Sequence, residues 1–261
     1  MGANMEKTWF TVKHLYPRVW AFVEFGHNEM VISYLFVGKK KCLLFDSGMG
    51  IGDLKKEIEK ISKLPLILVN SHCHFDHIGE NYKFLNIAIF NSKFSKNISK
   101  KGYLNNDLKP YLKSNYFLKI PPKNFSKANF HIFPFKFTKL LKDGEKIKID
   151  PFVFTIISTP GHTPDSICLY ESKNKLLLTG DTLYPGPIYL HFKESNLKDY
   201  IKSIKKIIAL EKQITDILPG HNFYHLDKKV LKIIYKKLYN FENIKNKKLQ
   251  VGISNISFVF K

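Results

Sequence analysis

The chain has 261 residues, of which 44% are hydrophobic and 14% aromatic, so it contains enough apolar material for one large α/β domain. This composition excludes an intrinsically disordered chain despite a formal net charge of +20. No apolar run approaches the ~18 residues that a membrane-spanning helix needs, and we therefore expect no membrane span.

The positive charge comes almost entirely from lysine, because Arg18 is the one arginine among 42 basic residues. Nucleic-acid surfaces usually use arginine as well, since its planar group binds phosphates and bases through two hydrogen bonds. Here lysine is spread along the whole chain, which is typical of an AT-rich coding bias. A nucleic-acid partner is therefore not favoured, although a positive field would attract an anionic small-molecule substrate.

The N-terminal ten residues lack a basic segment followed by an apolar one, so we expect no secretory signal. Cys42, Cys73 and Cys168 are odd in number and widely spaced, which argues against a disulfide framework. Both features predict a cytoplasmic protein. The sequence carries no signal for an oligomeric state.

Short β-type runs separated by turn residues open the chain and predict an antiparallel meander. These runs are residues 8–13, 19–25, 31–37 and 42–45. A helix is predicted over 53–63 from the spacing of its apolar residues, and a buried strand over 64–69. A loop over 70–79 follows this strand directly.

The middle of the chain, residues 92–129, is rich in lysine and aromatic residues and contains Pro110, Pro121 and Pro122. We expect an irregular surface insertion there.

The second half returns to strand and helix patterns. Strands are predicted over 147–157, 167–170, 175–179 and 215–218, helices over 197–211 and 227–245, and a terminal strand within 249–260. Two halves that each run from strands to a helix predict a single domain over 1–261, with two packed sheets and helices outside them.

Three imidazoles and one carboxylate lie within six residues directly after the predicted buried strand, at His72, His74, Asp76 and His77. Imidazole and carboxylate are the ligands that suit zinc and its neighbouring transition metals. His72 and His74 can face one side of an extended segment, whereas Asp76 and His77, displaced by a turn, can face a second point. The spacing predicts a metal site rather than a hydrogen-bonded loop.

This H-x-H-x-D-H pattern resembles the signature of the metallo-β-lactamase superfamily, and four other segments resemble further motifs of that family in the same order. They are Phe45-Asp46-Ser47-Gly48, Thr159-Pro160-Gly161-His162-Thr163, Leu178-Thr179-Gly180-Asp181-Thr182 and Leu218-Pro219-Gly220-His221-Asn222. The resemblance runs from about residue 20 to residue 225. It implies an α/β fold of the four-layer αββα sandwich type.

The resemblance also implies two divalent metal ions, expected to be Zn²⁺, with iron or manganese as alternatives. Seven residues would bind them: His72, His74 and His162 at one ion, Asp76, His77 and His221 at the other, and Asp181 as a bridge between the two. In the family the early motif, here with Asp46, supports the metal loop without binding metal. A hydroxide held between two ions is a nucleophile at neutral pH, and either ion can polarise the carbonyl under attack.

Departures from other branches of the family indicate an ester-like substrate. Asp181 stands where one branch of zinc β-lactamases has a cysteine, and His77 stands where that branch lacks a histidine. Both features resemble the glyoxalase II, thioesterase and lactonase branch, in which lactonase-like members place a substrate-binding tyrosine at the position of Tyr184. We therefore predict catalytic roles for Asp76, Asp181 and Tyr184 in hydrolysing a lactone or a thioester such as acyl-coenzyme A or hydroxyacylglutathione.

Two other activities stay open at this point. β-Lactam hydrolysis is an alternative, because the same hydroxide can attack a strained amide. Phosphodiester cleavage is a weaker one, because only 40 residues separate Asp181 from His221, where the nucleases of the family insert a large domain.

Overall fold

The computed structural model describes residues 8–242 and 256–259. Its first sheet has seven strands that stand in the sheet in the order in which they occur in the chain. They are β1 (Thr11–Tyr16), β2 (Val19–Val23), β3 (Ile32–Val37), β4 (Cys42–Phe45), β5 (Leu66–Val69), β6 (Ile87–Phe90) and β7 (Lys139–Leu141). The pairs from β1 to β4 are antiparallel, which confirms the predicted meander. The remaining pairs are parallel, so β4 and β5 end at the same edge of the sheet.

The second sheet has six strands in the order β14-β13-β11-β10-β9-β8. They are β8 (Lys146–Ile149), β9 (Phe152–Ser158), β10 (Ile167–Glu171), β11 (Leu176–Gly180), β13 (Asp216–Pro219) and β14 (Leu226–Asp227). The continuous strand expected over 147–157 is wrong. Asp150 and Pro151 form a turn, and the two strands on either side of it pair antiparallel.

A separate parallel pair joins β12 (Gly186–Tyr189) to β15 (Ile256–Val259). The described part of the predicted terminal strand is thus a strand, whereas residues 249–255 and 260 lie outside the described residues.

Helices cover the outer faces of both sheets. They are α1 (Leu54–Glu59), α2 (Lys93–Lys101), α3 (Asn105–Leu108), α4 (Leu197–Ile208) and α5 (Val230–Glu242), with 3₁₀ turns η1 (Asn81–Lys83), η2 (Lys109–Tyr111), η3 (Ser114–Tyr116) and η4 (Glu211–Gln213). The last three positions of the helix predicted over 227–245 lie outside the described residues. No helix of the described residues is long and apolar enough to cross a membrane.

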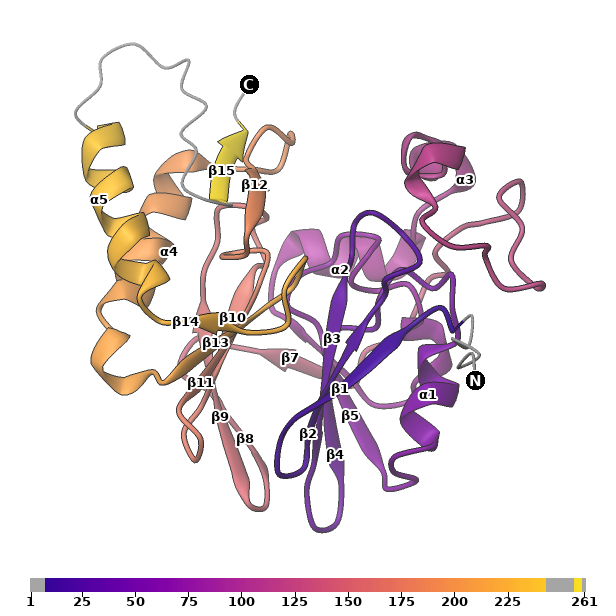
Figure 1. Cartoon of the computed structure of the whole chain (residues 1–261), viewed down its shortest axis with the longest axis horizontal. Coiled ribbons are helices and arrows are strands. Elements are labelled where there is room, and N and C mark those ends of the chain that lie inside the picture. The colour runs from indigo at the N-terminus through magenta and orange to yellow at the C-terminus, as the bar shows by residue number, and fades with distance from the viewer. Residues whose placement is uncertain (1–7, 243–255, 260–261) are drawn as a thin grey trace, which may run out of the picture.

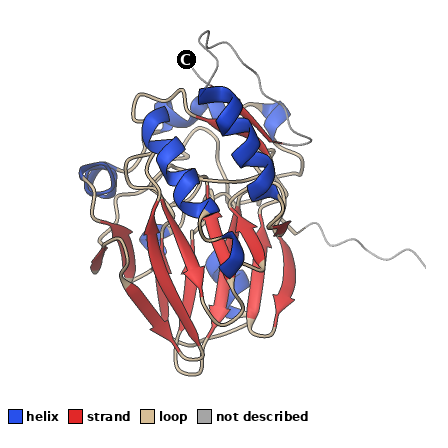
Figure 2. Cartoon of the chain, turned by 90° about the vertical axis from the view of Figure 1, so that its left-hand side faces the viewer, coloured by secondary structure: helices blue, strands red, loops and turns tan. Residues whose placement is uncertain are grey.

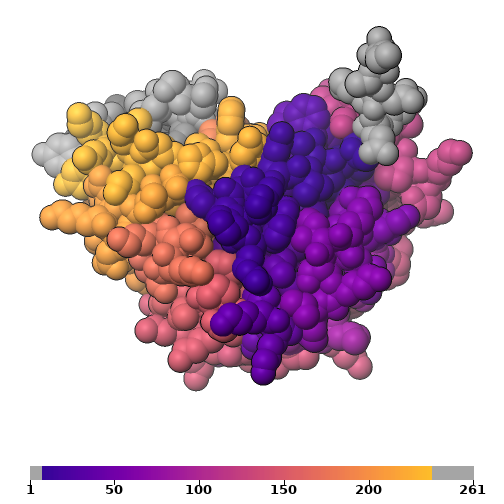
Figure 3. Space-filling view, turned by 60° about the horizontal axis from the view of Figure 1, so that its bottom comes forward, coloured from indigo at the N-terminus to yellow at the C-terminus, as the bar shows by residue number. Residues whose placement is uncertain are grey.

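The layers follow the order helix, sheet, sheet, helix, which confirms the predicted αββα sandwich. In Figure 1, α1 and α2 lie beside the first sheet and α4 and α5 beside the second. Figure 2 shows α4 and α5 crossing the outer face of the second sheet. The N-terminal and C-terminal halves occupy opposite sides of the molecule in Figure 3.

Buried aromatic side chains hold the two sheets together. Phe36 of the first sheet meets Phe152 and Phe154 of the second, with ring centroids 5.3 and 4.9 Å apart and planes close to perpendicular. Edge-to-face contacts of this kind add to the free energy gained by burying the rings. Two further apolar clusters lie beneath the outer helices, one on each side of the sandwich.

The segment 92–129 is not irregular over its whole length, as its composition suggested. It contains α2, whose first turn is capped by the Ser92 side chain accepting from the backbone N–H of Phe94. The buried positions of α2 are Ser95, Ile98 and Ser99. Two of these three are serines and four of the nine helix residues are lysines, so the sequence shows little apolar periodicity.

The loops that follow β4 and β5 cross at Gly79, whose N–H donates to the Gly48 carbonyl (2.8 Å). A Cβ at Gly79 would overlap the backbone of Met49 and Gly50. We expect Gly79→Ala to lower the free energy of unfolding by about 3 kcal/mol or more, because backbone cannot give way as a flexible side chain can. Urea unfolding of the purified variant measures this loss.

Gly144→Ala is the matched control. Gly144 has open space around its Cβ position but a φ of +77°, so alanine there should cost about 1 kcal/mol from backbone strain alone. Equal losses in the two variants would show that the loop crossing is not tightly packed.

Candidate metal centre

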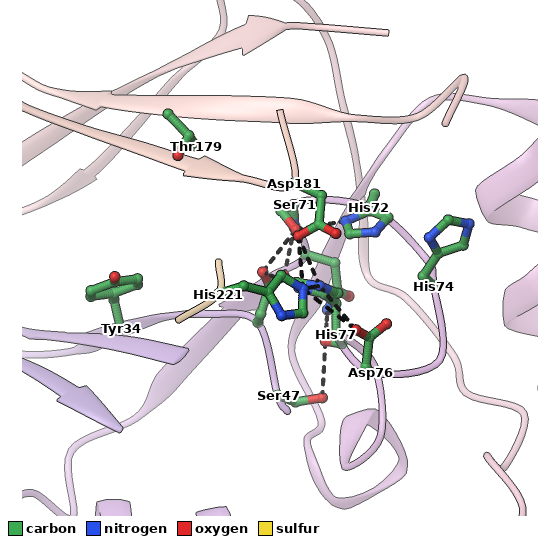
Figure 4. A network of polar contacts seen from close by, with 12 residues as sticks. Tyr34, Ser47, Ser71, His72, His74, Asp76, His77, Thr179, Asp181 and His221 are labelled. Carbon is green, nitrogen blue, oxygen red and sulfur yellow. Dashed lines mark hydrogen bonds and ion pairs between the residues drawn. The ribbon is translucent and has the colours of Figure 1, made fainter. Parts of the chain in front are cut away.

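The seven residues predicted as ligands come from four loops at one end of the two sheets. The loop after β5 provides His72, His74, Asp76 and His77, and the loops after β9, β11 and β13 provide His162, Asp181 and His221. Figure 4 shows the labelled members of this set grouped around one region. Side chains 149 residues apart in the chain therefore meet because both sheets end at the same place.

The position of the first loop depends on Asp46, which directly follows β4. Its carboxylate is fully buried and accepts from the Ser71 backbone N–H (2.7 Å), the Ser71 hydroxyl (2.7 Å) and His77 Nδ1 (2.9 Å). Parallel pairing of β4 with β5 brings these groups together. Asp46 therefore holds the loop from inside and does not face the other candidate ligands, in agreement with the supporting role that the family resemblance implies.

The loop that carries His221 is tied to the first sheet. The Tyr34 hydroxyl donates to the Pro219 carbonyl (2.7 Å), and the Ile32 N–H donates to the Gly220 carbonyl (2.8 Å). These bonds fix a residue of the second sheet's loop relative to the loop held by Asp46.

Outer oxygens fix the orientation of the imidazole rings. His77 Nδ1 lies against Asp46, His162 Nδ1 lies 2.7 Å from the Tyr189 carbonyl and His221 Nδ1 lies 2.6 Å from the Glu29 carbonyl. A carbonyl oxygen can only accept, so Nδ1 carries the proton in the last two rings. The Nε2 atoms of these rings are left without a proton and face the interior of the cluster.

His72 and His74 follow the same rule with different atoms. His72 Nδ1 lies 2.9 Å from the Ser71 hydroxyl, which itself donates to Asp46. His74 is reversed: its Nε2 meets the Glu194 carboxylate (3.1 Å), and its Nδ1 faces inward. In each ring one nitrogen is thus anchored by an oxygen, and the other is directed at the remaining candidate ligands.

The inward nitrogens face each other closely. His74 Nδ1 and His162 Nε2 are 2.9 Å apart, and His77 Nε2 and His221 Nε2 are 3.1 Å apart. Asp181 Oδ1 lies 3.1 Å from each member of the second pair without forming a hydrogen bond to either, and the buried His72 Nε2 has no hydrogen-bond partner. Lone pairs that converge in this way repel unless a cation stands between them, so the donor set fits metal ions.

The pKa values describe two different environments. Burial lowers the pKa of His72 well below its usual range, and burial together with His74 lowers that of His162 to about 4. These rings stay neutral, the form that binds metal. Burial opposes protonation of His221 as well, but the Asp181 carboxylate outweighs it and raises the pKa to about 9. The carboxylates therefore attract positive charge at this second group.

Three sets of candidate ligand atoms lie within 4.8 Å of one another. They are His72, His74 and His162; Asp76, His77 and His221; and His72, His77 and Asp181. The first two are the groups expected from the sequence, and the third connects them through Asp181. That they bind two ions, and that the ions are zinc, stays a prediction.

A cavity of about 450 Å³ opens onto this cluster. The candidate ligands on its wall are His74, Asp76, His162, Asp181 and His221, and aromatic residues form much of the remaining lining: Phe75, Tyr111, Tyr116, Tyr184, Tyr189 and Phe192. The Tyr184 hydroxyl donates to the Pro187 carbonyl. Its predicted role as a donor to substrate therefore requires this bond to be exchanged.

Sequence reasoning did not find Glu194 or the carbonyls of Glu29 and Tyr189. No motif marks them, because two of the three act through backbone atoms. Cys73 lies between two candidate ligands but is buried, and burial raises the pKa of its thiol well above the usual range. It does not belong to any of the candidate ligand sets in the described part of the chain.

Comparison with known proteins matches residues 29–221 to the model of the metallo-β-lactamase superfamily. The chain belongs to this superfamily. It is similar to the acyl-coenzyme A thioesterase MBLAC2 of Gallus gallus, with 26% identity over 82% of this chain and 80% of the relative. It is also similar to the hydroxyacylglutathione hydrolase GloC of Haemophilus influenzae, with 28% identity over 74% of this chain and 85% of the relative.

Among solved structures, the metallo-β-lactamase from Pontibacter korlensis has the same fold, with a TM-score of 0.61 and 15% identity over 88% of this chain and 99% of that one. Membership of the superfamily makes the protein a metal-dependent hydrolase.

The donor set leads to a prediction of stoichiometry. Purified protein should hold close to two transition-metal ions per chain, because six side chains divide into two groups that Asp181 connects. Elemental analysis after dialysis against zinc measures the ratio. Reproducible loading of one ion in excess zinc would contradict the dinuclear assignment.

A pair of variants separates the candidate bridge from the support. Asp181→Ala should leave the chain folded but reduce kcat by about a hundredfold or more, because at least one ion loses a ligand. Asp46→Ala should mainly lower the unfolding free energy and metal content, because it leaves buried donors of Ser71 without an acceptor. Circular dichroism, metal content and kcat of both variants test this. A fully loaded Asp181→Ala variant with wild-type kcat would show that Asp181 is not the bridge.

Proposed function

We propose that the protein hydrolyses acyl thioesters, with lactones as the next substrate class, at a dinuclear metal centre. His72, His74 and His162 would hold one ion, Asp76, His77 and His221 the other, and Asp181 would lie between them. The observation that carries the proposal is the convergence of unprotonated nitrogens and the Asp181 carboxylate at the floor of an aromatic-walled cavity.

The ions, when bound, supply Lewis-acid chemistry: they lower the pKa of water and polarise the oxygen of a carbonyl group. The chain supplies positioning. The outer hydrogen bonds of the histidines keep their inner nitrogens available, and Asp76, on the cavity wall, is a carboxylate that can accept a proton from water.

The cavity favours a substrate with an apolar part. Phe75, Tyr111 and Phe192 lie on its wall beside the candidate ligands, and their rings can pack against an acyl chain. The MBLAC2 and GloC relatives, which span most of the chain, carry thioesterase and hydroxyacylglutathione hydrolase names. Both substrates are thioesters, so the relatives and the cavity support the same bond type.

Phosphodiester cleavage has little support. The interval between Asp181 and His221 is filled by β12, α4, η4 and β13 of the main fold, and no additional domain is inserted there. β-Lactam hydrolysis shares the bond-breaking chemistry but has no observation of its own in this chain, and it enters as a comparison substrate.

A substrate panel tests the proposal. For the metal-loaded protein we expect kcat/KM to be higher for acyl-coenzyme A or S-lactoylglutathione than for nitrocefin or bis-p-nitrophenyl phosphate. Tyr184→Phe should lower kcat on carbonyl substrates if the phenol donates to the substrate oxygen. The ranking is overturned if the phosphodiester or nitrocefin is cleaved more efficiently than every thioester and lactone.

A further inference from the structure

The cavity has a cationic side chain that the metal centre does not use. Lys113 lies on its wall, and it is the one lysine or arginine among the described residues that line the cavity. Its side chain forms no ion pair with a carboxylate in the described part of the chain. A lysine without a counter-ion beside a substrate cavity can pair with a charge that the substrate brings.

A second lysine stands next to Lys113 in space although it is 14 residues further along the chain. Lys127 Nζ donates to the hydroxyl of Ser114 (3.2 Å) and lies 4.3 Å from the centre of the Phe117 ring. These contacts hold its ammonium group beside the residue that follows Lys113, and they leave its charge uncompensated by any carboxylate in the described residues.

The surrounding chain has a strong excess of positive charge. Residues 81–142 contain 13 lysines and one acidic residue, Asp107. This density is much higher than in the rest of the chain, so a uniform coding bias does not account for it. The excess lies on the segment that provides Pro110, Tyr111, Lys113 and Tyr116 to the cavity wall.

The carboxylates of the cavity lie elsewhere. Asp76 and Asp181 belong to the candidate metal cluster, whose ions would compensate them. Glu29 is the third acidic residue of the lining, and its backbone carbonyl accepts from His221 on that side of the cavity. The wall formed by η2 and η3 thus presents positive charge at a distance along the chain from each of these acids.

We propose that Lys113, with Lys127 behind it, forms an anion subsite that binds the negatively charged thiol portion of the substrate, in particular the phosphates of a coenzyme A thioester. The inference rests on the proposed thioesterase function and adds the residues that select the leaving group. An acyl chain would pack against the aromatic wall, and the phosphates would pair with the lysines at the mouth.

The test uses two thioesters with the same acyl group, one of coenzyme A and one of N-acetylcysteamine, which lacks phosphates. In metal-loaded protein, Lys113→Gln should raise KM for the coenzyme A thioester about three- to tenfold with little change in kcat, because the charge contributes to binding and not to bond cleavage. The KM for the N-acetylcysteamine thioester should not change. Lys113→Arg should retain the wild-type KM for both.

Lys123→Gln is the matched control, because Lys123 is an exposed lysine of the same segment that does not line the cavity. Adenosine 3′,5′-bisphosphate provides a second measurement that does not depend on turnover or on a thiol binding to metal. Calorimetry should show weaker binding of this bisphosphate to Lys113→Gln than to wild type or to Lys123→Gln.

The outcomes separate the two proposals. If neither thioester is cleaved, the proposed function is wrong, while the bisphosphate affinities still decide the subsite. If both KM values change equally in Lys113→Gln, or if the bisphosphate binds Lys113→Gln and Lys123→Gln with the same affinity, the anion subsite is wrong and thioester hydrolysis stands.

Discussion

The buried carboxylate of Asp46 is the contact on which the arrangement of the centre depends. It joins the ends of two parallel strands by accepting from both donors of Ser71, and it orients His77 at the same time. A carboxylate with no exposure is stable only when its lone pairs are satisfied, so the loop cannot move without leaving it uncompensated. The inner nitrogens of the cluster are therefore fixed by hydrogen bonds before any ion contributes.

The sandwich places the remaining candidate ligands relative to this point. His162, Asp181 and His221 belong to the second sheet, and the packed aromatic rings between the sheets set how far they stand from the first. Interiors packed at this density transmit a change of side-chain volume. Substitution of a core phenylalanine far from the cavity would thus alter distances among the candidate ligands.

Most of the fold and the candidate ligands could be predicted from the sequence because local patterns encode them. The strands alternate or are continuously apolar, and His72 to His77 form one short motif. The helix α2 escaped prediction because serines occupy two of its buried positions. The outer partners escaped because the Glu29 and Tyr189 carbonyls have no side-chain signature and Glu194 is 120 residues from His74. Contacts of this kind arise only from the tertiary fold.

The strand order of the first sheet bears on how the protein folds during synthesis. Neighbours in β1 to β7 are consecutive in the chain, and contacts between segments close in sequence form quickly. Residues up to Leu141 can therefore form a sheet before the second half leaves the ribosome. That nascent half carries His72, His74, Asp76 and His77, but the partners that complete both ligand groups emerge only with His162 and His221. Tight metal capture would accordingly mark the docking of the two halves, a late event in maturation.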